Sequence, residues 1–137
     1  MFQLTSQALE KLNLKSKLLS KSAGGFCSFE GWVRNHNDGH KVLRLEYEAY
    51  KPVCVSEAKK IITEAKKRFD VEKIICAHRI GKLQLGEMAV WVGVTAGHRY
   101  EAFAACRYVI DEIKKRVPIW KKEFYKNGDS GWVNSHG

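Results

Sequence analysis

The segment TAGHRYEAFAACRYVIDEIKKRVPIWKKE, residues 95–123, combines an amphipathic helix with more cationic groups than a helix needs. Apolar side chains recur in it at steps of three and four residues, which predicts a helix that begins near His98 and buries one face. Pro118 ends this helix, because proline lacks an amide hydrogen and disfavours helical geometry in the residue before it. Residues 119–123 should therefore form a separate segment. The predicted buried face consists of Ala102, Phe103, Cys106, Val109, Ile110 and Ile113.

The start of this helix carries cations where a helix favours anions. Free backbone amides and the positive end of the helix dipole attract negative charge, so His98 and Arg99 are mismatched there unless an anionic ligand also binds. Exposed side chains on a surface turn are the alternative, since Asp111 and Glu112 are equally mismatched toward the other end of the helix. We take His98 and Arg99 as candidate anion-binding residues.

The end of the helix is also basic. Residues 114–116 complement the negative helix terminus, and an ordinary solvated face would explain them. Lys121 and Lys122 follow an apolar pair, Ile119-Trp120, which should anchor the segment and fix where the lysines point. A lysine held beside other cations or partly desolvated loses its proton more readily and can act as acid, base or nucleophile.

Composition predicts one basic domain over residues 1–137. The chain has 24 Lys and Arg against 15 Asp and Glu, a net charge of +9. An anionic partner is therefore expected, and nucleic acid, phosphorylated metabolites and acidic proteins all qualify. The four cysteines are widely spaced in apolar runs, so we expect buried thiols and no metal or cofactor. No apolar run approaches the ~20 residues of a membrane span and no leader opens the chain, which favours a cytoplasmic protein without membrane contact.

The remaining patterns predict an α+β domain with alternating, half-buried strands. In the strand at 42–50, Leu43, Leu45, Tyr47 and Ala49 should share the buried face. Turn chemistry in RNHNDGH, residues 34–40, predicts a hairpin loop that presents Arg34 and His36, and Gly31 predicts a bulge or a close approach. The other expected elements are a short helix at 7–12, a loop at 15–22, strands at 24–33, 73–78 and 88–95, a link at 79–87, a helix from Pro52 to Phe69, a turn at 127–131 and a strand at 132–133.

Five separated motifs are specific enough to suggest a family. They are FEGWVRNHNDG, LEYEAY, HRIGKLQLGE, GVTAGHRYEAF and VPIWKKE. In this order and spacing they resemble the large subunit of molybdopterin synthase, and the resemblance extends from about Gly24 to Val133. It implies an α/β hammerhead-type fold with an antiparallel sheet and two main helices.

The resemblance also implies an activity. Such proteins are cytosolic sulfurtransferases of molybdenum cofactor biosynthesis, which add two sulfurs to cyclic pyranopterin monophosphate to form the dithiolene of molybdopterin. The sulfur arrives as a thiocarboxylate on the C-terminal Gly-Gly tail of a small ubiquitin-like subunit. Two large subunits form a homodimer at the centre of a heterotetramer. No nucleic acid is expected as a partner.

Carried over motif by motif, the resemblance assigns substrate-binding roles to the positions that the residue patterns already favour. Arg34, His98 and Arg99 would hold the phosphate and the pterin edge. Lys121 would be the general acid/base or the nucleophile that captures the partner's carbonyl, and Lys114 would orient the tail or stabilise negative charge. The full set is Trp32, Val33, Arg34, His98, Arg99, Lys114, Lys121, Lys122 and Glu123.

Two other classes of function fit parts of the sequence. The order of strands and helices and the pI near 9.5 suit a small RNA-binding module, although residues 25–29 imitate the aromatic strand of such modules only loosely. A non-catalytic scaffold for a ubiquitin-like protein would keep the partner and lose the chemistry.

Overall fold

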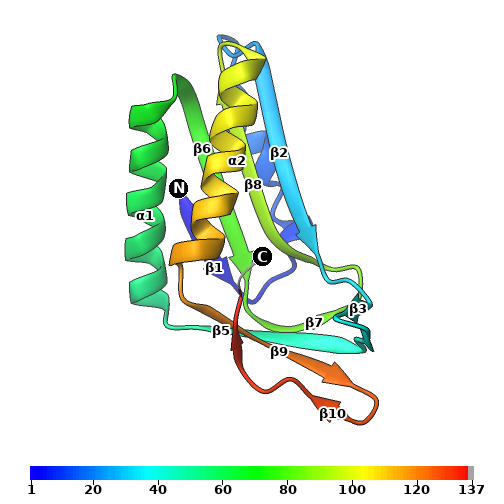
Figure 1. The fold of residues 1–137 in the computed structure, drawn as a ribbon. Coiled ribbons are helices and arrows are strands. Elements are labelled where there is room, and N and C mark those ends of the chain that lie inside the picture. Colours follow the sequence, from blue (N-terminus) through cyan, green and yellow to red (C-terminus); the bar gives the residue numbers. More distant parts are fainter. Residues whose placement is uncertain (136–137) are drawn as a thin grey trace.

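Two long helices lie side by side on one face of a four-stranded sheet, in a computed structural model that describes residues 1–135 (Figure 1). The sheet order is β1-β6-β8-β2, and a smaller sheet with the order β10-β9-β5-β7 runs crosswise below the helices. The elements are β1 Phe2–Thr5, η1 Leu9–Lys11, η2 Leu14–Leu18, β2 Gly25–Trp32, β3 His36–Asn37, β4 His40–Lys41, β5 Arg44–Ala49, α1 Lys51–Arg68, β6 Val71–Arg79, β7 Gly81–Gln84, β8 Met88–Ala96, α2 Arg99–Arg116, β9 Ile119–Tyr125, β10 Gly128–Asp129 and β11 Val133–Asn134. The predicted α+β class is confirmed.

The main sheet is mixed, whereas the resemblance implied an antiparallel sheet. The difference is β1, which pairs parallel to β6 and which the sequence pattern did not reveal. Backbone bonds at the chain start hold it in place: the Met1 ammonium donates to the Ile74 carbonyl oxygen at 2.8 Å, and the Cys76 amide donates to the Met1 carbonyl oxygen at 2.9 Å. A four-residue strand is too short to show a clear alternation of polar and apolar residues.

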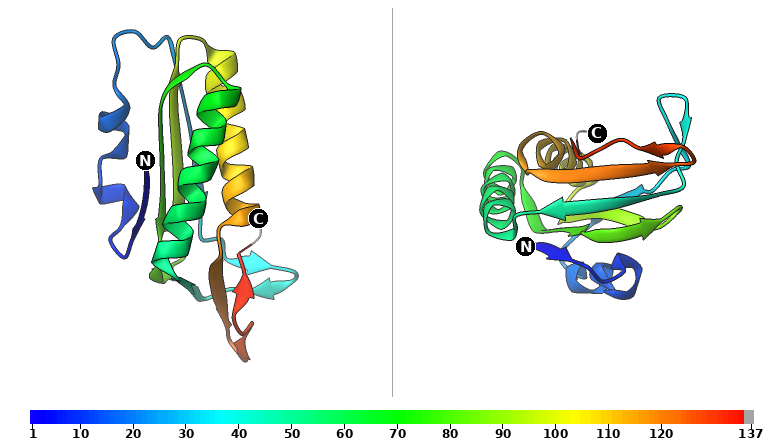
Figure 2. Two further views of the ribbon diagram at one scale, coloured as in Figure 1. Left: turned by 90° about the vertical axis from the view of Figure 1, so that its left-hand side faces the viewer. Right: turned by 90° about the horizontal axis from the view of Figure 1, so that it is seen from below.

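The segment after β1 covers the face of the sheet opposite the helices, which gives three layers (Figure 2, left). The short helix predicted at 7–12 is present as the 3-10 helix η1 at Leu9–Lys11. The loop predicted at 15–22 is wrong over residues 15–18, which belong to a second 3-10 helix, η2. Asn13 has a left-handed backbone, with φ of 51°, which separates them. Leu9, Leu14 and Leu18 are buried against Trp91 in a second, smaller core.

Helix α2 begins and ends where the sequence predicts, but one of its core residues is misplaced. Phe103 was expected in the buried face, yet its side chain is 64% exposed, and Ala105 packs inward instead. The 3.6-residue period places both positions near the edge of the apolar stripe, so the pattern does not distinguish them. Similarly, Leu43 is 42% exposed while Val42 is fully buried, because the regular alternation of β5 begins only at Arg44.

Two local features that the sequence predicted are present, and one strand was missed. The predicted 34–40 hairpin is present. Asp38 and Gly39 have positive φ, 48° and 79°, a conformation that these residue types tolerate in turns. The predicted bulge is present, since the register between β2 and β8 shifts between Gly31 and Trp32. Strand β7 lies within the predicted link at 79–87, where glycines and polar residues conceal it.

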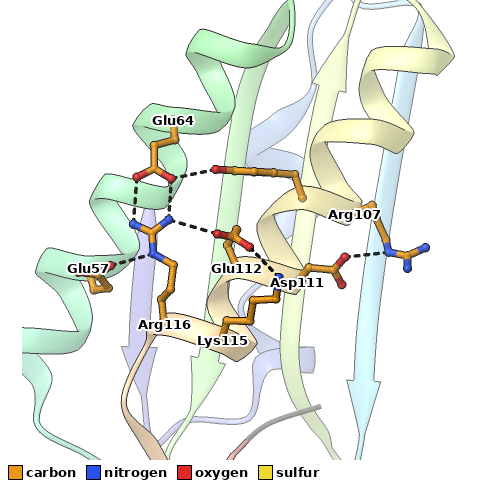
Figure 3. A network of polar contacts seen from close by, with 8 residues as sticks. Glu57, Glu64, Arg107, Asp111, Glu112, Lys115 and Arg116 are labelled. Atoms are coloured by element: carbon orange, nitrogen blue, oxygen red, sulfur yellow. Dashed lines mark hydrogen bonds and ion pairs between the residues drawn. The ribbon is translucent and has the colours of Figure 1, made fainter.

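Helices α1 and α2 are held together by the guanidinium group of Arg116 (Figure 3). It donates two hydrogen bonds to the Glu64 carboxylate, at 2.6 and 2.9 Å, and a third to Glu57 at 2.9 Å. The Tyr108 hydroxyl donates to the same Glu64 carboxylate at 2.8 Å. Hydrogen bonds from Arg116 hold the pKa of Glu64 at about 2, below its ordinary 4.5. The last turn of α2, which carries Lys114, is therefore fixed to α1.

Removing the Glu64 charge should destabilise the protein in a pH-dependent way. The pKa of Glu64 is lower in the folded protein than in the unfolded chain, so its ionised carboxylate stabilises the fold. This stabilisation is present above pH 4.5, the pKa in the unfolded chain, and is lost as pH falls toward 2. The midpoint temperature of unfolding of Glu64→Gln should therefore lie below that of the wild type at neutral pH. The difference between the two midpoints, the gap, should narrow below pH 4.5. Thermal unfolding across a pH series measures it, with exposed Glu48→Gln as control. A gap that stays constant down to about pH 3 contradicts the assignment.

Candidate functional site

A cleft of about 830 Å³ opens where the end of β2, the last turns of α2 and the start of β9 meet. In β5 and β9, Tyr47 pairs with Lys121 and Leu45 with Glu123, so these four side chains share the face of the small sheet that borders the cleft. The lining residues are Phe29, Gly31, Trp32, Val33, Arg34, Leu45, Tyr47, Ala89, Val90, Arg107, Ile110, Asp111, Lys114, Lys115, Lys121, Glu123 and Ser135.

Six of the nine predicted site residues line this cleft. They are Trp32, Val33, Arg34, Lys114, Lys121 and Glu123. Lys122 does not, because the period of two in a strand turns its side chain to the opposite face of β9. There its ammonium lies 5.7 Å from the centre of the Phe124 ring, 5.5 Å from that of Trp132 and 4.0 Å from the Asp129 carboxylate.

His98 and Arg99 lie at the other end of α2. His98 caps the helix and Arg99 is its first residue, whereas Lys114 comes fifteen residues later, about 22 Å along the helix axis. A single chain therefore does not bring His98 and Arg99 together with Arg34, as the predicted anion site requires. The helix start is held tightly, because a Cβ atom on Gly24 would stand 2.5 Å from the Gly97 carbonyl oxygen.

Lys114 is the most perturbed cation of the cleft. Its ammonium donates to the Ser135 hydroxyl at 3.5 Å. Burial lowers the pKa of Lys114, and the positive charge of Lys121 lowers it further. The two lysines are thus close enough to affect each other, and the loss of a proton from Lys114 is made easier.

Glu123 is a buried carboxylate held by the β3–β4 hairpin. Its Oε1 accepts hydrogen bonds from the Asn37 amide at 2.8 Å and from the Tyr125 hydroxyl at 3.1 Å. The Arg34 guanidinium donates to the other end of the Asn37 side chain, to Oδ1, at 3.1 Å. Asn37 therefore links the cation and the carboxylate of the cleft, a role that the turn pattern alone could not reveal.

Tyr47, Ser135 and Arg107 are lining residues that the sequence did not identify. The alternation of β5 placed Tyr47 inward but gave no reason to assign it to a site. Ser135 follows β11, whose position depends on pairing between Val133 and Lys121. Within residues 1–135, no three His, Cys, Asp or Glu side chains gather in a way that could hold a metal ion. The described chain also has no helix with the length and apolarity that crossing a membrane requires.

The family model of the MoaE protein matches residues 4–116. The chain belongs to the MoaE protein family. Among the relatives of this MoaE chain, the molybdopterin synthase catalytic subunit of Thermoplasma volcanium is 42% identical over 130 residues, which cover 95% of each chain. That of Synechococcus elongatus is 48% identical over 111 residues, 80% of this chain and 67% of the relative.

Solved structures agree with this membership. The crystal structure of molybdopterin synthase from Staphylococcus aureus superposes with a TM-score of 0.90 at 32% identity and covers 96% of each chain. A complex of subunits 1 and 2 of molybdopterin-converting factor from Helicobacter pylori matches with a TM-score of 0.80 at 23% identity, over 98% of this chain and 92% of that one. At this lower identity, the similarity shows the fold.

Behind the cleft lies a buried histidine, His78. Its Nδ1 is 2.8 Å from the Arg79 carbonyl oxygen, which can only accept, so Nδ1 carries the hydrogen. Nε2 has no hydrogen-bond partner among the described residues. Burial, reinforced by the charge of Lys114, lowers the pKa of His78 to about 3. The imidazole is therefore neutral at physiological pH.

His78 should make the protein sensitive to mild acid. The pKa of His78 in the folded protein lies below its unfolded value of 6.5. The full free energy of unfolding is therefore present above pH 6.5, and it decreases as pH falls toward 3, because the unfolded chain then binds a proton that the folded chain does not. We expect the free energy of unfolding to drop between pH 6.5 and 4.5, and His78→Phe to remove most of this drop. Denaturant unfolding at several pH values measures it, with exposed His36→Phe as control. An equal drop in His78→Phe contradicts the prediction.

Proposed function

We propose that this chain is the catalytic subunit of a molybdopterin synthase. It transfers sulfur from the thiocarboxylated C-terminus of a small ubiquitin-like partner to cyclic pyranopterin monophosphate and so forms the dithiolene of molybdopterin. The observation that carries this proposal is the convergence of Lys114, Lys121, Arg34 and Glu123 on one cleft in a chain of the MoaE family. They come from three separate parts of the sequence, because Lys121 and Glu123 share strand β9.

The charge of the cleft suits an anionic substrate. Five cationic side chains line it against two carboxylates: Arg34, Arg107, Lys114, Lys115 and Lys121 against Asp111 and Glu123. Arginine binds phosphate through paired hydrogen bonds, so Arg34 is placed to hold the substrate phosphate. An extended Gly-Gly tail can approach buried lysines closely because it has no side chains. The cleft can thus receive both reactants.

Lys121 and Lys114 have different roles in the reaction. Lys121 acts through its proton or its amine lone pair, as general acid/base toward the substrate or as the group that captures the partner's carbonyl. Lys114 stabilises the negative charge that develops when sulfur adds. Glu123, held by Asn37 and Tyr125, fixes the polar edge of the cleft on which the substrate is oriented.

A second copy of the chain supplies His98 and Arg99. Strand β2 is an edge of the main sheet, and the α2 surface beside it exposes a stripe of Tyr100, Phe103, Arg107 and Asp111. Burying one phenylalanine contributes about 1.5–3 kcal/mol, so an exposed Phe103 favours a partner surface. A two-fold axis near the middle of α2 would lay two α2 helices antiparallel. The start of one would then lie beside the last turn of the other, where Lys114 stands.

These surfaces support one assembly. Two copies pair through β2 and α2, and one small subunit delivers its tail to each cleft, which gives a heterotetramer. The four cysteines are free thiols, which agrees with action in the cytoplasm, where thiols stay reduced.

Lys121→Arg should abolish sulfur transfer almost as completely as Lys121→Ala, by at least about 100-fold, because arginine keeps the charge but offers no usable lone pair. Lys114→Arg should be milder, since an electrostatic role tolerates another cation. The assay combines the protein with a thiocarboxylated small subunit and cyclic pyranopterin monophosphate in a single turnover and detects the dithiolene product by mass. Lys59→Arg, on the exposed face of α1, is the control.

Two outcomes bear on the function itself. If the wild-type chain forms no dithiolene product, the protein is a non-catalytic scaffold for the small subunit. Near wild-type activity in Lys121→Arg would make Lys121 an electrostatic clamp and move the proton chemistry to another residue.

Two inactive variants should complement each other if His98 and Arg99 act across the dimer. In a mixed dimer of Arg99→Ala and Lys121→Ala, one cleft carries both substitutions and the other carries neither. Random pairing of equal amounts should restore about a quarter of the wild-type sites. Lys114→Ala mixed with Lys121→Ala is the matched control, since neither cleft of that dimer is intact. Recovery in the control, or none in the first mixture, contradicts the arrangement.

A further inference from the structure

Lys114 packs against a buried polar layer that the proposed chemistry does not use. Its ammonium donates to the Ser135 hydroxyl at 3.5 Å, and the Ser135 hydroxyl also interacts with that of Tyr47. The Tyr47 ring meets the ring of His78 at 83°, with 4.9 Å between the ring centres. All three residues of the layer are buried, and they come from β5, β6 and the segment after β11.

We propose that Ser135 and Tyr47 are positioning residues that hold the Lys114 ammonium at the rear of the cleft, with the ring of His78 as their support. The inference rests on the proposed function, because it places these residues in the site where Lys114 acts. Neither hydroxyl needs to contact the substrate, since both act through Lys114.

Ser135 is held firmly enough for this role. Its amide donates to the Ile119 carbonyl oxygen at 2.8 Å, and Val133, two residues before it, pairs with Lys121 in the sheet. The same short segment therefore contacts both lysines of the cleft, one through the backbone and one through a side chain. A lysine has a flexible four-carbon stem, so a fixed acceptor restricts where its charge can lie.

Tyr47 completes the hydrogen bonding of Ser135. Burial raises the pKa of Tyr47 to about 12, so its hydroxyl keeps its proton and can both donate and accept. A hydroxyl that accepts from an ammonium has its own hydrogen left to donate, and Tyr47 offers the acceptor. The Ser135 hydroxyl can therefore interact with the Lys114 ammonium and the Tyr47 hydroxyl at the same time.

His78 supports these residues without adding charge. An imidazolium ion behind Tyr47 would repel the Lys114 ammonium, whereas the neutral ring provides an edge-to-face contact. The titratable groups around Lys114 that a pH measurement must consider are Lys121 and Glu123 on β9, Tyr47 on β5, Cys76 and His78 on β6, and Asp111 and Lys115 on α2.

The test begins with the isolated protein. Acetic anhydride labels lysines only in the amine form, and mass spectrometry of the digested protein gives the labelling midpoint of Lys114 across a pH series. In Ser135→Ala the midpoint should fall by about half a pH unit or more, since the ammonium loses an acceptor. Tyr47→Phe should shift the Lys114 midpoint less, and Ser135→Thr should keep it at the wild-type value. The labelling midpoint of exposed Lys59 should not change in any variant.

Sulfur transfer provides the second measurement. Ser135→Ala should slow the single-turnover rate constant about tenfold, the effect of one lost hydrogen bond, with unchanged affinity for the small subunit. The matched control is Ser22→Ala, whose hydroxyl bonds to Glu72 outside the cleft. An unchanged Lys114 midpoint in both Ser135→Ala and Tyr47→Phe overturns the inference. A shifted midpoint with normal sulfur transfer keeps the positioning role and instead contradicts the role proposed for Lys114 in catalysis.

Discussion

The break in the chain at Pro118 is the constraint on which the site depends. Helix α2 ends at Arg116, and the Val117 amide donates the last helical hydrogen bond to the Ile113 carbonyl oxygen at 3.1 Å. Proline then forces the chain out of the helix and into β9, which crosses below the helices (Figure 2, right). Because of this change of direction, Lys114 from the helix and Lys121 from the strand reach the same cleft. A helix continued through this point would have carried them apart along its axis.

Much of this arrangement was predictable because it depends on local rules. The apolar spacing of α2, the proline that ends it and the turn residues of the 34–40 hairpin each act over a few positions, and the structure confirms all three. The alternation of β5 likewise predicted that Tyr47 faces inward. Six of the nine candidate residues line one cleft, and three of them, Trp32, Val33 and Glu123, were identified only through the resemblance.

What the sequence could not reveal depends on contacts between distant segments. Strand β1 exists because β6 offers it an edge, and Ser135 enters the cleft because β11 pairs with β9. The exposure of Phe103 depends on which neighbours α2 meets, and a periodic pattern contains no information about them. His98 and Arg99 were recognised from helix-end electrostatics, but their distance from the cleft follows only from the length of the folded helix.

A crystal structure of the protein with cyclic pyranopterin monophosphate tests most directly the central claim that a composite cleft binds the substrate. We expect the substrate phosphate between Arg34 and Lys121 of one copy, with His98 and Arg99 of the second copy within hydrogen-bonding distance. A substrate bound away from Lys114 and Lys121, or a dimer in which His98 and Arg99 face solvent while the cleft is occupied, would contradict the account.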